Sequence, residues 1–248
     1  MMFLLLAAAP LQAAPADTRQ RRFEACAALA ETDPAAARAE ALRWGVAGGA
    51  WFARQCAGLA YAREANWPLA AAEFEAAAKA SELARDRRAA TYRAQAGNAW
   101  LAAGEPAKAR AALDSALVAG TLTGLELGEA QLDHGRAMVA TGNLDAARRD
   151  IDLALVTAAD DPLAWLLSAT LARRMQDLPR AKKDIAEALR RAADDASVQL
   201  EAGNIAAAGG DEAGARAAWG EAARLAPNAD TGHHAIAALK QFDAVPAK

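Results

Sequence analysis

The side chains that most often carry chemistry in proteins are sparse in this sequence. Histidine can bind metals or move protons near neutral pH, and the chain contains His134, His233 and His234. No cysteine or carboxylate lies at metal-ligand spacing from His134. His233 and His234 are adjacent, so on a helix their side chains would point in different directions. We therefore expect no metal site, and we interpret His134 as a buried or half-buried structural residue.

Acidic pairs and serines are the other candidates for catalysis. Paired carboxylates can act as general acid and base, and the sequence contains the pairs Asp160-Asp161 and Asp194-Asp195. Both pairs precede stretches of helical character, where aspartate commonly caps a helix N-terminus. No serine lies in a nucleophile elbow, and no glycine-rich phosphate loop follows a strand. The sequence predicts no catalytic residue, no cofactor and no enzymatic activity.

The composition favours a chain built from helices. Alanine dominates, β-branched runs are nearly absent, and aromatic residues make up only 5%. Closely packed alanine-rich helices fit this composition better than a β-sheet core. The net charge is −3 and the isoelectric point is about 5.7, which lacks the basic footprint of a nucleic-acid-binding protein. We expect an all-α fold that binds no nucleic acid.

A repeated pattern indicates how the helices are arranged. Between Pro162 and Pro227 one pattern occurs twice, and each shared position lies 34 residues from its counterpart. Ile185 corresponds to Trp219, and small residues recur on either side of both. A fixed period of this length is the signature of stacked helical hairpins. Small residues allow two helices to approach closely, while the large residue fills the space between them.

The pattern resembles that of the tetratricopeptide repeat family. Counted from Trp51, small residues stand at positions 8, 20 and 27 and large residues at positions 11 and 24, and further copies follow. The resemblance implies an all-α, right-handed superhelical solenoid of stacked helical hairpins. We expect five repeats within residues 51–227, approximately at 51–84, 90–123, 128–161, 162–195 and 196–229.

Weaker helical segments flank the expected repeats. Residues 17–50 are interpreted as a degenerate first hairpin, in which Asp33 and Pro34 begin the second helix. Residues 230–242 are expected to form a helix that covers the exposed end of the stack, because terminal elements of solenoids require a polar outer face. Residues 243–248 are expected to be a loose tail.

Two cysteines, Cys26 and Cys56, fall in the expected first helices of neighbouring hairpins. Such helices lie side by side, which permits a disulfide that would stabilise the fold by about 3–4 kcal/mol in the chain-entropy description. The alternative is two free, buried thiols that act as small apolar side chains. The sequence leaves both possibilities open.

The family resemblance also implies where a ligand would bind. In tetratricopeptide repeats the first helix of each pair lines the concave groove, chiefly through positions 5, 9, 12 and 13. An extended peptide or another protein would be the ligand. The candidates at these positions are Gln55, Leu59, Arg63, Asn98, Leu132, Arg136, Leu166, Thr170, Arg173, Arg174, Leu200 and Asn204.

One well-known ligand mode of the family is not expected here. That mode uses Lys and Asn on successive first helices to clamp two carboxylates. Asn98 and Asn204 occupy the Asn slot, but Ala94 and Leu200 stand where Lys is required. Binding of an acidic chaperone tail is therefore not expected.

Charge is spread unevenly along the chain. Residues 122–162 carry a net charge of −5, and residues 171–192 carry +4. Neighbouring fields of opposite sign can steer a partner or pair two copies of a protein. Charged helix surface that only complements the helix dipoles is the simpler interpretation. The oligomeric state is not determined by the sequence.

The N-terminal segment suggests export. Residues 2–9 are continuously apolar, and Ala14-Pro15-Ala16 offers small residues where a signal peptidase would cut before Asp17. We interpret residues 1–16 as a signal peptide, which predicts a periplasmic protein of the bacterial envelope. The apolar run is too short to span a bilayer, which takes about 20 residues, so stable membrane insertion is not expected. The alternative is a cytoplasmic adaptor or regulator with an uncleaved N-terminus.

Overall fold

The computed structural model describes residues 18–243, which form thirteen α-helices and no β-strand. The predicted signal peptide (1–16) and most of the predicted tail lie outside these residues. The helices in chain order are α1 (Thr18–Thr32), α2 (Pro34–Val46), α3 (Ala50–Arg63), α4 (Trp67–Leu83), α5 (Ala89–Ala102), α6 (Pro106–Val118), α7 (Gly124–Ala140), α8 (Leu144–Thr157), α9 (Pro162–Arg174), α10 (Leu178–Arg191), α11 (Ala196–Ala208), α12 (Glu212–Leu225) and α13 (Asp230–Asp243).

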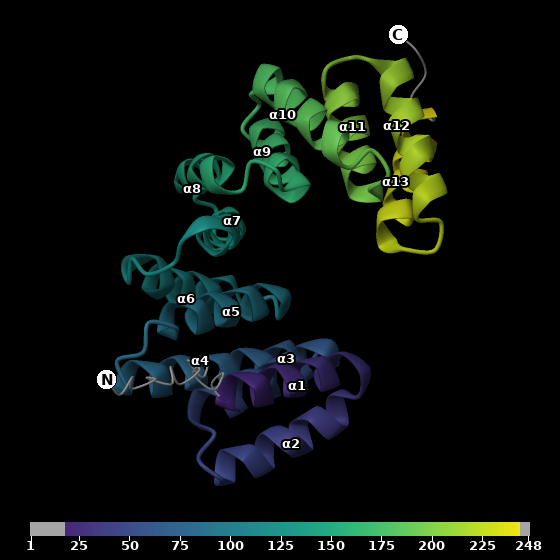
Figure 1. Ribbon diagram of the computed structural model, residues 1–248. Helices are drawn as coiled ribbons and strands as arrows, with labels where there is room; N and C mark the ends of the chain where they lie inside the picture. Colours follow the sequence, from purple (N-terminus) through teal and green to yellow (C-terminus); the bar gives the residue numbers. More distant parts are fainter. Residues whose placement is uncertain (1–17, 244–248) are drawn as a thin grey trace, which may run out of the picture.

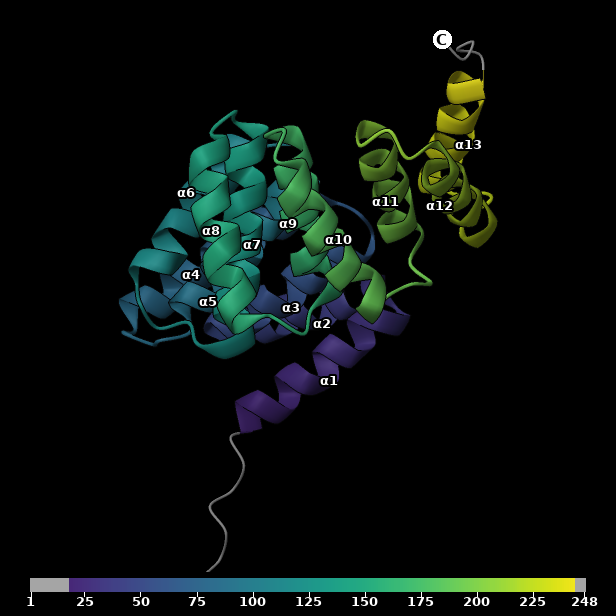
Figure 2. The same cartoon turned by 90° about the horizontal axis from the view of Figure 1, so that it is seen from above.

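Consecutive helices pair as hairpins, and the hairpins stack into an elongated solenoid. Figure 1 shows the chain passing from α1 and α2 at one end, through the hairpins α3–α4, α5–α6, α7–α8 and α9–α10, to α11–α13 at the other. Each hairpin is rotated relative to the one before it, so the stack follows an arc. The view from above in Figure 2 also places α1 and α13 at opposite ends.

Local sequence signals set the helix starts. An aspartate or asparagine side chain accepts a hydrogen bond from a backbone N–H in the first turn of α2, α8, α9, α10, α11 and α12. In the two acidic pairs of the sequence, the second aspartate does this: Asp161 accepts from the N–H of Leu163 and Asp195 from that of Ser197. These aspartates are therefore helix caps, as their position predicts.

In the five hairpins from α3–α4 to α11–α12, the turn contains one residue in the left-handed conformation. Its φ is positive at Gly104, Gly142 and Gly210, where glycine adopts it without steric cost. The equivalent turns of the α3–α4 and α9–α10 hairpins place Ala65 and Gln176 there, with φ of 55° and 62°. A side chain in this conformation is strained, so these two turns are held by the packing of the helices on either side.

Glycine in the first helix of a hairpin lies against a large side chain of the second helix. The pairs are Gly58 with Phe74, Gly97 with Leu113, Gly135 with Ile151 and Gly203 with Trp219, each 16 residues apart. A Cβ added to any of these glycines would come within 3.0 Å of the large side chain. The absence of a side chain at this position therefore sets how closely the two helices pack.

The N-terminal hairpin is attached to the stack by a disulfide and by aromatic packing. Cys26 of α1 and Cys56 of α3 are bonded, with their Cα atoms 6.0 Å apart. The ring centroids of Trp44 in α2 and Phe52 in α3 lie 6.0 Å apart in a stacked arrangement. Together these contacts connect α1 and α2 to the first helix of the next hairpin.

At the other end, α13 covers the last hairpin. Its Ala235 is fully buried against α12, and the ring of Phe242 meets that of Trp219 edge-on, with centroids 5.4 Å apart. His233 and His234 of α13 are exposed and take no part in this contact. Without α13, the apolar surface around Trp219 would face water.

Candidate functional site

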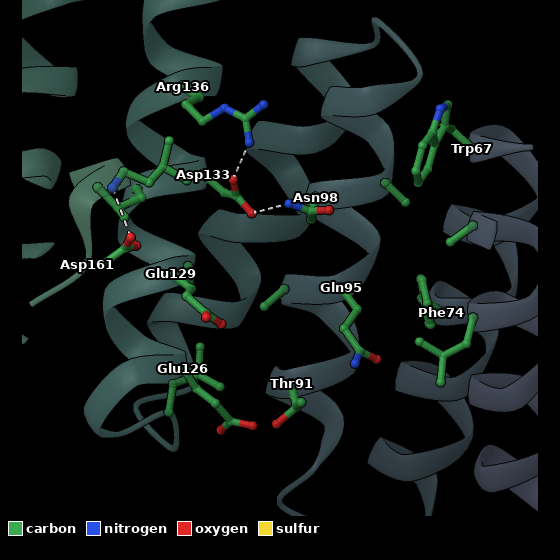
Figure 3. A pocket seen from close by; sticks show the side chains of 18 residues that line it. Trp67, Phe74, Thr91, Gln95, Asn98, Glu126, Glu129, Asp133, Arg136 and Asp161 are labelled. Atoms are coloured by element: carbon green, nitrogen blue, oxygen red, sulfur yellow. Dashed lines mark hydrogen bonds and ion pairs between the residues drawn. The ribbon is translucent and has the colours of Figure 1, made fainter. Parts of the chain in front are cut away.

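A hollow of about 490 Å³ lies on the face formed by the first helices of neighbouring hairpins. This volume is within the usual range for ligand-binding clefts. Side chains of α3, α4, α5 and α7 line it, together with the start of α9 (Figure 3). The stacking of four consecutive hairpins therefore builds this one site.

One wall of the hollow is acidic. Glu126, Glu129, Asp133 and Arg136 line it from α7. Their spacing of three, four and three residues places them on one face of the helix. Asp161, the cap of α9, adds a fourth carboxylate at the edge. This wall therefore carries four carboxylates against one guanidinium.

The opposite wall is neutral and polar. Figure 3 shows Thr91, Gln95 and Asn98 of α5 facing the carboxylates of α7. These hydroxyl and amide groups can both donate and accept hydrogen bonds. Trp67 and Phe74 of α4 lie beyond α5, on the side away from the acidic residues (Figure 3). The hollow thus offers acidic, neutral polar and aromatic groups in sequence across its width.

The four carboxylates differ in whether other side chains or the backbone form hydrogen bonds or ion pairs with them. Asp133 accepts hydrogen bonds from Asn98 Nδ2 at 2.7 Å and from Arg136 Nη1 at 2.7 Å. The carboxylate of Asp161 accepts a hydrogen bond from the backbone N–H of Leu163. Within residues 18–243, no hydrogen bond or ion pair involves the carboxylate of Glu126 or Glu129.

The excess of negative charge on this wall affects the pKa of Glu129. Partial burial raises the pKa of its carboxyl group, and the negative charges of Asp133, Asp161 and Glu126 raise it further. A carboxylate among like charges gains stability when a cation approaches. The side chains of this wall are therefore arranged to favour a positively charged group in the hollow.

A second hollow, of about 750 Å³, is lined by α2, α3 and α4, and half of its lining residues are alanine. Its charged residues pair with one another or with neighbours: Arg54 Nη1 lies 2.9 Å from Glu73 Oε2, and Arg38 pairs with Glu64. Leu42 and Val46 stand exposed at its rim. Its charged side chains are therefore already paired and offer no uncompensated charge to a ligand.

Comparison with solved structures identifies the architecture. PilW, a widely conserved type IV pilus biogenesis factor, matches with a TM-score of 0.74 at 16% identity over 89% of this chain and 99% of its own. PilF of Pseudomonas aeruginosa matches with a TM-score of 0.69, also at 16% identity and over the same shares. YrrB, a tetratricopeptide-repeat protein with an unusual peptide-binding site, matches with a TM-score of 0.56 at 20% identity over 76% of this chain and 91% of its own.

The fold is that of the tetratricopeptide-repeat proteins. No protein-family model matches the sequence, and neither does any curated protein. The assignment therefore rests on the arrangement of helices, which the repeat pattern predicts and the solved structures share. None of the helices described here is long and apolar enough to cross a membrane.

Four of the groove residues predicted from the repeat positions line the hollow: Leu59, Asn98, Leu132 and Arg136. Asn98 and Arg136 are exposed and both contact Asp133. Leu132 is only 2% exposed, because it packs into the core between α7, α8 and α9. It forms part of the floor, and its contribution to a ligand contact is correspondingly small.

The other predicted groove residues lie outside the hollow. Arg173 pairs with Glu201 at 2.6 Å, and Asn204 bonds both to Glu201 and to the indole N–H of Trp219. These contacts join α9, α11 and α12, so they already have a structural role. The remaining side chains are Gln55 (buried, bonded to Gln95), Arg63 (exposed, paired with Glu31), Thr170, Leu166 and Leu200 (all half-buried) and Arg174 (exposed).

Sequence reasoning missed the residues at positions 2 and 6 of the repeats. Thr91 and Glu129 stand at position 2, and Gln95 and Asp133 at position 6, counted from residues 90 and 128. A signal was present, since residues 122–162 carry a net charge of −5. Glu126, Glu129 and Asp133 also share one helical face, which the spacing alone shows.

The interpretation of His134 as a residue without a carboxylate partner is wrong. The sequence indicated no carboxylate partner, but its Nδ1 lies 2.9 Å from Asp150 Oδ2 of α8 and its Nε2 lies 3.0 Å from Asp114 Oδ1 of α6. The second contact is an ion pair that is not aligned as a hydrogen bond. The hydrogen bond to Asp150 raises the pKa of His134, and Asp114 adds to this effect. Both partners come from neighbouring helices, so short-range spacing does not show them.

The polar cluster around Ser168 is a buried network between three helices. Ser168 Oγ donates to Asp184 at 2.5 Å and accepts from Arg148 Nη2 at 3.0 Å. Arg180 also bonds to Asp184 and pairs with Asp152. These groups connect α8, α9 and α10, and Ser168 and Asp184 are only 0% and 3% exposed. Within residues 18–243, no three His, Cys, Asp or Glu side chains are grouped to hold a metal ion.

Proposed function

We propose that this protein is a non-enzymatic binding scaffold that holds a segment of another protein, or an extended peptide, in the hollow between α3 and α9. The observation that carries the proposal is the hollow itself, in which the carboxylates of Glu126 and Glu129 have no partner among the described residues. Ligand clefts usually carry a few polar groups that fix the orientation of the ligand. The fold is shared with YrrB, which has a peptide-binding site.

The polar clusters elsewhere support a scaffold over an enzyme. His134, Asp184 and Glu201 each bond to side chains of neighbouring helices, so they contribute to the stacking of hairpins. The hollow has carboxylates and neutral polar groups on its walls but no nucleophile paired with a base. These residues can recognise a ligand, and we assign them no reaction.

We place the protein in the bacterial envelope. Three observations support this: the sequence pattern of residues 1–16, the disulfide between Cys26 and Cys56, and the likeness to pilus biogenesis factors. Disulfides form and persist in oxidising compartments such as the periplasm. The competing hypothesis is a cytoplasmic adaptor with an uncleaved N-terminus. Mass spectrometry of the purified protein separates them: envelope localisation predicts a mature N-terminus at Asp17, and an intact N-terminus in a cytoplasmic fraction contradicts it.

Site-specific photo-crosslinking in cells tests the binding role. A photoreactive residue at Thr91 or Asn98 points into the hollow, and one at Arg110, exposed on α6, is the matched control. Binding in the hollow predicts a discrete adduct from Thr91 and Asn98 and none from Arg110. Adducts of equal yield from all three positions, or none from the hollow, would contradict the proposal.

A further inference from the structure

The acidic wall of the hollow limits which ligand it can take. If the hollow binds a polypeptide, as proposed above, the ligand must place positive charge opposite α7, where Glu126 and Glu129 lack partners within residues 18–243 and Asp133 and Asp161 add charge. Arg136 is the only basic side chain among the residues that line the site, and it already pairs with Asp133. An acidic ligand would be repelled here.

We infer that the hollow is specific for an extended segment that carries Lys or Arg next to an apolar residue. Seven residues of α-helix separate Glu126 from Asp133, a rise of about 10 Å, which matches about three residues of extended chain. The carboxylates are therefore distributed along a segment, and the described residues do not bring three of them together around one ion.

The other sides of the hollow suit the rest of such a segment. Thr91, Gln95 and Asn98 face the acidic wall and can bond to the peptide backbone (Figure 3). Leu59 and Trp67, both half-buried, add apolar surface to the lining, whereas Phe74 is only 4% exposed and contributes little. An apolar side chain beside the Lys or Arg would contact this surface and remove it from water. This charge preference is opposite to that of the family's carboxylate clamp, whose Lys slots hold Ala94 and Leu200 here.

A peptide-binding experiment tests the inference on the whole chain. The probe is a short fluorescent peptide, Gly-Ser-Lys-Phe-Lys-Ser-Gly, and fluorescence anisotropy gives its Kd. Matched peptides replace both lysines by glutamine or by glutamate. We expect the lysine peptide to bind most tightly, the glutamate peptide to show no binding, and the affinity for the lysine peptide to fall as salt screens the charges.

Two double variants separate the site from general electrostatics. Glu126→Gln with Glu129→Gln removes two charges from the hollow. Asp145→Asn with Asp194→Asn removes two charges from exposed positions outside it. The first variant is expected to raise the Kd about tenfold, because it removes two exposed ion pairs between the hollow and the peptide. The second is expected to leave the Kd unchanged.

The remaining outcomes overturn the inference in distinguishable ways. Equal losses in both double variants would mean that the peptide responds only to net charge. Tight binding of the glutamine or glutamate peptide, or failure of the lysine peptide to bind, would refute the charge preference. Dimerisation of the protein alone, abolished by Glu126→Gln with Glu129→Gln, would assign the hollow to a second copy. In each case the crosslinking from Thr91 and Asn98 still decides separately whether the hollow binds a protein.

Discussion

The contact between a glycine and a large side chain within each hairpin can be tested at Gly97. A Cβ at this position would lie 2.4 Å from Cγ of Leu113 and 2.9 Å from its Cδ1. Leu113 is fully buried, so its side chain has little room to move. Gly97→Ala should therefore force the two helices apart, and overpacking of this kind typically costs about 1–3 kcal/mol.

A control variant removes the effect of helix propensity. Alanine inside a helix is more stable than glycine by about 1 kcal/mol, which would hide part of the steric cost. Gly220 lies within α12, and a Cβ there meets no atom within 4 Å. Gly220→Ala should therefore stabilise the protein, and the two variants should differ by about 1–3 kcal/mol in the free energy of unfolding. Urea denaturation followed by far-ultraviolet circular dichroism measures both.

A double-mutant cycle with Leu113→Ala shows whether the steric cost comes from this contact. Shortening Leu113 leaves a cavity, which the methyl group of Gly97→Ala can partly fill. We expect a favourable coupling free energy of at least about 1 kcal/mol between the two substitutions. The steric conflict is refuted if Gly97→Ala is as stable as Gly220→Ala. It is also refuted if the effects of Gly97→Ala and Leu113→Ala on the free energy of unfolding are additive.

Three further predictions concern other parts of the fold. The pKa of His134 is raised above its unfolded value near 6.5, so the stabilisation that its charged form provides is complete below that pH and is lost as the pH rises through the folded pKa. The melting temperature of the wild type should therefore fall between pH 6 and pH 8.5 by more than that of His134→Gln. An equal fall in the melting temperatures of both proteins would contradict this. Replacing both Cys26 and Cys56 by alanine should lower the free energy of unfolding by about 3–4 kcal/mol, because their bond closes a loop of about 30 residues. Reductant should destabilise the wild type by a similar amount. If reductant leaves the wild type unchanged while the double variant is destabilised, the loss comes from packing and not from the disulfide. Gln176→Gly should stabilise by about 1 kcal/mol or more by relieving a positive φ, and a lower urea midpoint would refute that reason.

The sequence predicts the helical stack because its main determinants are local and periodic. Gly97 and Leu113 stand in the same slots as Gly203 and Trp219, and both pairs make the same contact in the structure. Helix caps such as Asp161 depend on residues two or three positions away, so they too can be read from the sequence. The family resemblance adds the direction of the groove.

The contents of the groove are harder to predict because they depend on which side chains of different hairpins meet. Arg173 occupies a groove position of the repeat, yet Glu201 of the next hairpin pairs with it. The carboxylates of Asp114 and Asp150 reach His134 from two other helices. The acidic face of α7 was visible as a net charge, but its position opposite α5 follows only from the superhelical stacking.

The proposed binding role depends most on the hollow as the binding site, and filling the hollow with a large side chain tests this directly. Thr91→Trp places a large side chain in the space between α5 and α7, and Arg110→Trp places the same side chain on the outer surface of α6. Isothermal titration calorimetry with the lysine peptide, or with the partner captured by crosslinking, should show binding lost in Thr91→Trp and unchanged in Arg110→Trp, with both variants as helical as the wild type. Unchanged affinity in a folded Thr91→Trp protein would show that the peptide does not bind in the hollow.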